Sequence, residues 1–147
     1  MAGQHVWARR PGVAVHINAF NFPAWGLCEK LATALLAGMP VIAKPATATA
    51  LVAHRLAQLF EPVLPPGVLQ MLPGDADAGE AMCTDPNIQM ISFTGSTAVG
   101  RIVAQAAAKN LTPVTLELGG KSPVIVDAKG TFESIAPKIA IGKLFNA

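Results

Sequence analysis

Charged residues are scarce in this chain. Only 14% of its 147 residues are Asp, Glu, Lys or Arg, whereas an average soluble domain has about 25%. The net charge is +2, and the basic residues are scattered along the sequence. This pattern argues against a nucleic-acid-binding face, so we expect no nucleic-acid partner.

Cysteine is almost absent, and tyrosine is missing altogether. The two cysteines, Cys28 and Cys83, lie far apart, with no C-x-x-C spacing and no neighbouring cluster of His or Asp. This arrangement predicts neither a disulfide framework nor a metal site. Cys28 falls in a helical hydrophobic pattern, where a small buried side chain is its expected role. We expect neither cysteine to be a nucleophile.

Long hydrophobic runs are also missing. A membrane-spanning helix needs about 20 consecutive apolar residues. The longest uncharged candidate, 31–43, contains Gly38 and Pro40 and has a lysine at either end. Residues 1–12 lack the apolar core of a secretory signal. We therefore expect no membrane partner and a cytoplasmic location.

The hydrophobic content of 52% fits a sheet that is buried on both faces, because strands of parallel sheets read as continuous apolar runs. Short apolar runs alternate with helical patterns along the chain. We expect strands at 12–20, 41–43, 68–72, 90–93, 114–118 and 123–127, and helices at 23–38, 47–60, 75–83, 98–109 and 132–146. The last helix should be interrupted at Pro137 or begin there. This alternation predicts an α/β domain with a parallel, Rossmann-like sheet, helices on both faces and ligands at the carboxyl ends of the strands.

One strand-to-helix junction, the segment 93–100 with the sequence FTGSTAVG, is a candidate phosphate-binding loop. The positive dipole end of a helix that begins near Ser96 favours an anion, and Gly95 permits a tight turn. The spacing G-x-x-x-x-G differs from the G-x-G-x-x-G fingerprint. Arg101 and Ile102 stand where a P-loop requires Lys and then Ser or Thr, which disfavours an NTPase. From the residues alone, a simple strand-to-helix turn remains the alternative.

A second motif, ELGGK at 117–121, places a carboxylate beside two glycines at the end of an apolar run. The glycines let backbone or ligand approach closely. A carboxylate held there is a candidate general base. The alternative is a carboxylate at a strand end that pairs with Lys121.

These segments resemble motifs of the NAD(P)-dependent aldehyde dehydrogenases. Residues 117–121 resemble that family's glutamate motif and 93–100 its cofactor loop; NFP at 21–23 is similar to its oxyanion-asparagine motif, and KPA at 44–46 to its adenosine-side lysine motif. The four motifs occur in the family's order. The resemblance implies an oxidoreductase that oxidises an aldehyde to a carboxylic acid with NAD or NADP through a cysteine thiohemiacetal.

The resemblance also implies roles for individual residues. Asn21 would donate its side-chain N–H to the developing oxyanion, and Glu117 would be the general base for the hydrolytic water, which requires a pKa raised by burial. The implied cofactor-binding residues are Lys44 and Thr47 on the adenosine side, Gly95, Ser96 and Gly100 on the pyrophosphate side, and Leu118 and Gly119. An Asx turn is the alternative for Asn21, and a solvated lysine for Lys44.

One departure from the family pattern concerns the choice of cofactor. Many NAD-preferring members carry a glutamate directly after Lys-Pro-Ala, where it accepts the ribose hydroxyls and repels a 2′-phosphate. Here that position is Thr47. Removing a carboxylate from about 4 Å of a phosphate relieves a repulsion of roughly 1–4 kcal/mol per charge pair. We therefore expect NADP to bind at least as well as NAD.

The sequence ends in Phe-Asn-Ala at 145–147, which is similar to the start of the segment that precedes the nucleophilic cysteine in the family. We therefore expect 1–147 to be a partial NAD(P)-binding domain, truncated before that cysteine and inactive alone, from a homo-oligomeric enzyme. Residues 12–49 resemble CoA-linked semialdehyde dehydrogenases of aromatic degradation, and 93–127 those acting on long-chain aliphatic or coniferyl aldehydes. The alternative is a non-catalytic α/β module that binds a nucleotide or a partner chain.

Overall fold

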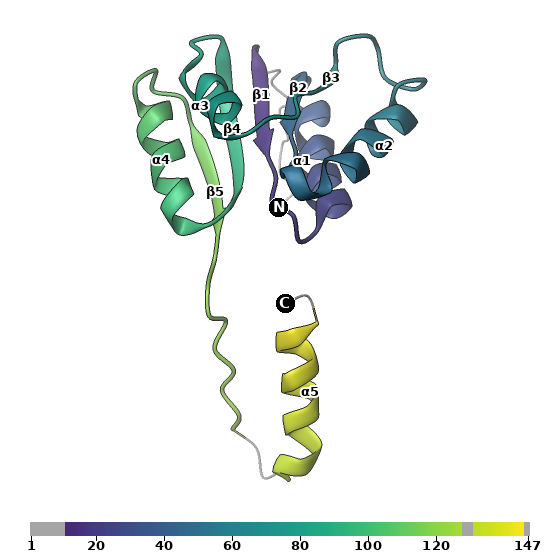
Figure 1. The fold of residues 1–147 in the computed structure, drawn as a ribbon, viewed down its shortest axis with the longest axis vertical. Coiled ribbons are helices and arrows are strands. Elements are labelled where there is room, and N and C mark those ends of the chain that lie inside the picture. Colours follow the sequence, from purple (N-terminus) through teal and green to yellow (C-terminus); the bar gives the residue numbers. More distant parts are fainter. Residues whose placement is uncertain (1–10, 128–130, 146–147) are drawn as a thin grey trace, which may run out of the picture.

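The computed structural model describes residues 11–127 and 131–145. Within them, five parallel strands form one sheet in the order β3-β2-β1-β4-β5 (Figure 1). The strands are β1 (Val13–Ile17), β2 (Val41–Lys44), β3 (Leu69–Met71), β4 (Ile88–Gly95) and β5 (Val114–Leu118). Because the chain proceeds outward from β1 to one edge and then returns to β4, the topological switch point lies between β1 and β4.

Helices follow the strands, and the first four α-helices cover the two faces of the sheet. The helices are α1 (Pro23–Leu36), the short 3-10 helix η1 (Thr47–Thr49), α2 (Ala50–Phe60), α3 (Ala76–Thr84), α4 (Thr97–Ala108) and α5 (Phe132–Leu144). Alternate residues of β1 point to opposite faces: Ala14 packs with the buried residues of α1 and α2, and Val15 with those of α3 and α4. The predicted α/β architecture is confirmed.

Helix α1 carries several of the side chains near the switch point. Pro23 occupies its first turn, where a missing N–H costs nothing. It ends before Gly38, which adopts φ 78°, a backbone conformation that glycine accepts at little cost. Its buried face consists of Leu27, Lys30, Leu31 and Ala34. A lysine thus lies within an otherwise apolar stripe.

The C-terminal part of the chain differs from the prediction. The strand expected at 123–127 does not form; 119–127 contains neither helix nor strand, and Ile125 is 90% exposed. This apolar run has no strand to pair with among the described residues, and β-propensity acts only through such pairing. Helix α5 runs from Phe132 through Pro137 to Leu144, so the expected break at the proline is wrong. Of the helix expected at 132–146, residue 145 lies beyond the end of α5, and residue 146 lies outside the described part of the chain.

The lengths and apolar character of the helices can be compared with what a membrane-spanning helix requires. None of those in the described part of the chain combines the length and the apolar character required to cross a bilayer.

Candidate functional site

The candidate site residues come together at one edge of the sheet, where the strands reach their carboxyl ends. Asn21 follows β1, Lys44 is the last residue of β2, Gly95 ends β4 and Glu117 is the penultimate residue of β5. Parallel strands bring these ends to the same edge, which is where open α/β sheets bind ligands. Residues up to 96 positions apart in the sequence, from Asn21 to Glu117, therefore share one surface.

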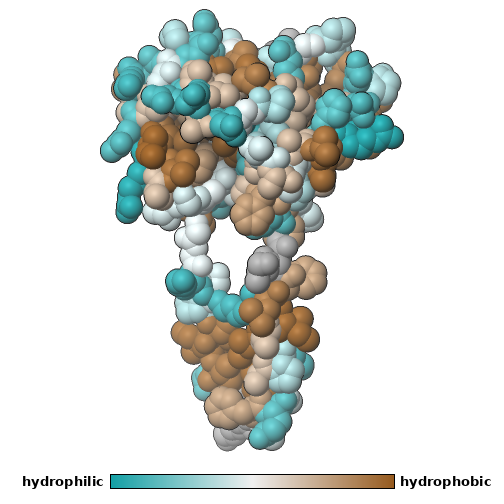
Figure 2. Space-filling model, viewed as in Figure 1, coloured by the Kyte–Doolittle hydropathy of each residue, from teal (hydrophilic) through white to brown (hydrophobic). Residues whose placement is uncertain are grey.

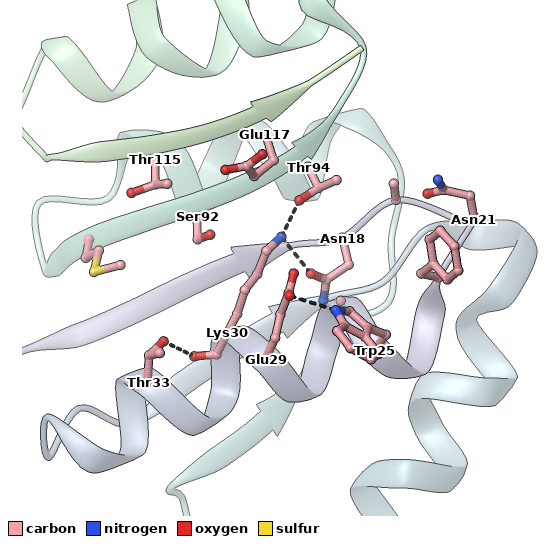
Figure 3. Close-up of a pocket in the computed structure, with 14 residues that line it drawn as sticks. Asn18, Asn21, Trp25, Glu29, Lys30, Thr33, Ser92, Thr94, Thr115 and Glu117 are labelled. Atoms are coloured by element: carbon pink, nitrogen blue, oxygen red, sulfur yellow. Dashed lines mark hydrogen bonds between the residues drawn. The ribbon is translucent and has the colours of Figure 1, made fainter. Parts of the chain in front are cut away.

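Two adjoining cavities open at this edge. The larger one, about 780 Å³, is lined from α1, β4 and β5 by residues that include Asn18, Asn21, Trp25, Glu29, Lys30, Thr94 and Glu117 (Figure 3). The smaller one, about 510 Å³, is lined by Ala19, Phe20, Asn21, Ala46, Thr94, Gly95, Ser96, Glu117, Leu118 and Gly119. The two cavities share Ala19, Asn21, Thr94 and Glu117. The two residues assigned to catalysis by resemblance thus lie at the boundary between the cavities.

Both of those residues are exposed to solvent. The Asn21 side chain lies at the start of α1, and Glu117 projects from β5 toward the cavity (Figure 3). The burial expected for a general base at Glu117 is therefore not supplied by the described residues.

Lys30 is the functional candidate that sequence reasoning missed. Its ammonium donates hydrogen bonds to Thr94 Oγ1 at 2.6 Å and to Asn18 Oδ1 at 3.1 Å, so it joins α1 to the ends of β4 and β1 (Figure 3). Burial lowers the pKa of Lys30, while Glu29 and Glu117 partly oppose that shift. The signal was present in the sequence, because a lysine three residues after Leu27 falls on the buried face of an amphipathic helix.

The start of helix α4 forms one wall of the smaller cavity. Ser96 caps this helix, since its Oγ accepts a hydrogen bond from the backbone N–H of Val99 at 3.2 Å. Gly95 precedes it, and a Cβ at Gly95 would lie 2.6 Å from Cζ of Phe93. Leu118 and Gly119 reach the same cavity from β5. Four of the seven residues assigned to the cofactor are thus brought together.

Gly100 has a different position. It is buried one turn further into α4, and a Cβ there would lie 2.6 Å from Cδ2 of Leu118. A side chain at this position would require the Leu118 side chain to shift. The geometry therefore gives Gly100 a role in helix–strand packing beneath the cavity.

Lys44 and Thr47 lie on the β2 side of the same edge. The Lys44 side chain runs along α3, with its Cε 3.7 Å from the position that a Cβ on Gly79 would occupy. Thr47 is exposed, and its hydroxyl donates a hydrogen bond to Oδ1 of Asp75 at 3.2 Å. Ala46, between them in sequence, lines the smaller cavity. This side of the site is therefore continuous with the start of α4.

The cysteines lie elsewhere. Cys83 is buried against α4 in α3, and burial raises its thiol pKa. Cys28 was expected to be buried but is only half-buried on α1. Neither belongs to the residues that line the two cavities. In the described part of the chain, no group of three or more His, Cys, Asp or Glu side chains is arranged to hold a metal ion.

A cavity at the switch point of a parallel sheet, beside a capped helix N-terminus, is the arrangement of a dinucleotide-binding α/β domain. The chain belongs to the aldehyde dehydrogenase family, whose family profile matches residues 4–147.

Known relatives agree with this assignment. Over 136 residues the chain is 40% identical to geranial dehydrogenase of Castellaniella defragrans, covering 92% of this chain and 28% of that protein. Over 150 residues it is 39% identical to betaine aldehyde dehydrogenase of Agrobacterium fabrum, covering 100% of this chain and 30% of that protein. Its fold is similar to that of a variant of aldehyde dehydrogenase C from Pseudomonas syringae, solved with NAD+ and octanal. The TM-score is 0.88 at 40% identity, and the similarity covers 92% of this chain and 28% of that one. The chain spans less than a third of the length of the relatives it matches.

Proposed function

We propose that this chain is the cofactor-binding part of an NAD(P)-dependent aldehyde dehydrogenase, an enzyme that oxidises an aldehyde to a carboxylic acid. One observation carries the proposal: the start of α4 and the Leu118-Gly119 pair line one cavity, and Asn21 and Glu117 stand where it meets a second. Family membership supports the reaction class.

The smaller cavity is the proposed cofactor site. Backbone N–H groups in the first turn of α4, which have no carbonyl partner within the helix, and the positive end of the helix dipole favour the pyrophosphate. Gly95 has no side chain to obstruct the approach of the phosphates, and Lys44 and Thr47 lie further along the edge, where adenosine would extend. When bound, the nicotinamide ring supplies the hydride acceptor.

The larger cavity is the proposed aldehyde site. Asn21 at its boundary would donate a hydrogen bond to the developing oxyanion, a role that costs about 3–4 kcal/mol when removed. Glu117 would activate the hydrolytic water. Since Cys28 and Cys83 lie outside both cavities, the nucleophilic thiolate would come from residues outside this chain. Those residues would also bury Glu117.

The exposed aromatic side chains of Phe22 and Trp25, at the larger cavity, suit an aldehyde with an apolar body. The similarity of 12–49 to CoA-linked semialdehyde dehydrogenases and of 93–127 to aliphatic or coniferyl aldehyde dehydrogenases leaves both substrate types as candidates. A homo-oligomeric parent enzyme remains part of the proposal.

Calorimetric titration of the chain with NAD and with ADP-ribose tests the cofactor site. We expect weak binding of both, because the nicotinamide-side contacts are incomplete. Ser96→Asp keeps a helix-capping side chain but adds a negative charge beside the pyrophosphate. A like charge at about 4 Å should weaken ADP-ribose binding about tenfold or more.

Two further variants make this test specific. Gly95→Val should abolish binding, and Gly142→Val, at an α5 glycine with nothing within 4 Å, should not. Thr131→Asp at the first turn of α5 is the control for the added charge in Ser96→Asp. Absence of nucleotide binding by folded protein, or equal binding by Ser96→Asp and Thr131→Asp, would leave the cofactor assignment without support and would favour the partner-binding module.

A further inference from the structure

We propose that Asp75 selects NAD over NADP. This inference rests on the proposed function, since it concerns the adenosine end of the same cofactor site. Asp75 directly precedes α3 and is exposed. It would place a carboxylate where the 2′-phosphate of NADP has to lie.

The Asp75 carboxylate is held toward the end of β2. Residues at the start of a helix commonly cap it with their side chains, but the Asp75 side chain makes no capping hydrogen bond to α3. Its Oδ1 instead accepts a hydrogen bond from the Thr47 hydroxyl at 3.2 Å. The carboxylate is therefore directed to the segment that follows Lys44, although it lies 28 residues from Thr47 in the sequence.

Lys44 brings a cation to the same place. Its methylene stem crosses α3 at Gly79, where Cδ and Cε lie 3.8 and 3.7 Å from the position that a Cβ on this glycine would occupy. Because Gly79 has no side chain, the lysine can lie flat against the first turns of α3. Lys44, Thr47 and Asp75 thus surround one small surface, and Ala46 connects it to the cavity beside Ser96.

The charges on this surface favour a ribose with free hydroxyl groups. Lys44 can donate to a ribose oxygen, and the Asp75 carboxylate can accept from a ribose 2′-hydroxyl. A 2′-phosphate has no proton to offer in its ionised form and would meet the carboxylate as a like charge. Asp77, also acidic and in the first turn of α3, adds a second negative charge. The Asp75 carboxylate, beside Thr47, is therefore the group that opposes a 2′-phosphate on this surface.

This arrangement changes what Thr47 implies. Judged by sequence alone, a threonine after Lys-Pro-Ala removes the carboxylate that opposes NADP. In the folded chain the Thr47 hydroxyl instead orients a carboxylate from another element. The negative charge is supplied by Asp75, so tolerance of NADP does not follow from Thr47.

Calorimetric titration of the chain with ADP-ribose, NAD and NADP tests the assignment. Wild type should bind NAD about tenfold more tightly than NADP, the effect of a like charge about 4 Å away in a high dielectric. Asp75→Asn should raise NADP affinity about tenfold and leave ADP-ribose affinity within about threefold, the range for one exchanged hydrogen bond. Asp85→Asn, at the other end of α3, is the matched control.

Two more measurements separate a charge effect from a structural one. Thr47→Val removes the hydrogen bond that directs Asp75 and should lower the discrimination, which Thr47→Ser should restore. Raising the salt concentration from 0.05 to 0.5 M should also lower the discrimination between NAD and NADP. The reason is that the Debye length, over which exposed charges interact, falls from ~14 to ~4 Å.

The outcomes distinguish the two proposals. Binding of NAD with no preference over NADP, or a preference that Asp75→Asn leaves unchanged, would overturn the role of Asp75 and leave the cofactor site intact. No binding of ADP-ribose, NAD or NADP by the folded chain would overturn both.

Discussion

Two regions of this chain both contain apolar runs in their sequence but differ in packing. The sheet body, residues 11–118, contains all the buried hydrophobic side chains among the described residues. The C-terminal segment, residues 119–127 and 131–145, contains none, and Leu144 is 69% exposed. Figure 1 shows α5 apart from the sheet, and Figure 2 shows apolar side chains gathered on its surface. An apolar pattern alone therefore does not decide what packs; a neighbouring face is required.

The contacts of α5 are correspondingly few. Lys143 donates hydrogen bonds to the backbone carbonyls of Lys121 and Ser122, so α5 is linked to the segment 119–127. Exposed contacts of this kind add little stability. The buried hydrophobic side chains, and with them most of the stabilising free energy, lie in the sheet body. We propose that the C-terminal segment packs against other parts of the parent enzyme.

Truncating a core side chain should have the largest effect. Leu27 is 0% exposed between α1 and the sheet, so Leu27→Ala should lower the free energy of unfolding by about 2–5 kcal/mol. Ile125→Ala, at a side chain of the C-terminal segment that is 90% exposed, should change the free energy of unfolding by less than about 0.5 kcal/mol. Urea denaturation followed by circular dichroism measures both. Equal losses would contradict the division into two regions.

The next effect is a loss of stability in acid. Burial, with a smaller contribution from the Lys30 charge, lowers the pKa of His16 from 6.5 to about 4. Above pH 6.5 the imidazole of His16 is neutral in both the folded and the unfolded state. Its full contribution to the free energy of unfolding is therefore present there. As pH falls from 6.5 to 4 the unfolded state binds the proton first, so about 3 kcal/mol of stability is lost.

His16→Gln tests that dependence because glutamine does not titrate. The difference in unfolding free energy between wild type and His16→Gln should therefore change between pH 6.5 and 4 and stay constant above pH 7. His54→Gln, at an exposed position of α2, is the control. A pH-independent difference for His16→Gln would mean that this imidazole is not buried in neutral form.

A smaller effect is expected at the helix caps. Ser96→Ala removes the side chain that caps α4 and should lower the free energy of unfolding by about 1 kcal/mol. Thr131→Ala at the start of α5, whose side chain makes no capping bond, should leave global unfolding unchanged. Thermal denaturation compares the two. A larger loss for Thr131→Ala would show that α5 belongs to the folded body.

We expect the chain alone, and its cysteine variants, to show no activity in an aldehyde dehydrogenase assay. The chain alone should produce no NADH or NADPH at 340 nm with aliphatic, aromatic or CoA-linked aldehydes, because neither cysteine lies at the cavities. Cys28→Ala and Cys83→Ala should therefore behave like wild type. Turnover that Cys28→Ala abolishes would show that the nucleophile lies on α1.

The alternation of strands and helices could be predicted from the sequence, because both periodicity and Gly or Pro breakers are local properties. The carboxyl edge as the ligand site follows from parallel topology. The missing strand at 123–127 could not be predicted, since strand formation depends on a partner. Of the site, the motif residues were found from resemblance, and Asn21, Gly95, Ser96, Glu117 and Gly119 do converge.

Three features of the site depend on contacts between elements distant in sequence. Lys30 is buried because Asn18 and Thr94 accept its hydrogen bonds from two strands. Gly100 is close to β5 because Leu118 packs above it. Asp75 meets Thr47 across 28 residues. Sequence patterns that describe one element at a time can place Lys30 on the buried face of α1. They do not contain its hydrogen-bond partners, the packing at Gly100 or the hydrogen bond between Thr47 and Asp75.

Hydrogen–deuterium exchange with and without saturating NAD tests the central claim most directly, that the carboxyl edge of the sheet body holds the nucleotide. NAD should slow exchange at 95–99, at the start of α4, and at 18–22, after β1, and leave 131–145 unchanged. Protection confined to α5 or to the amino ends of the strands, or no protection in a chain shown to bind NAD, would contradict it.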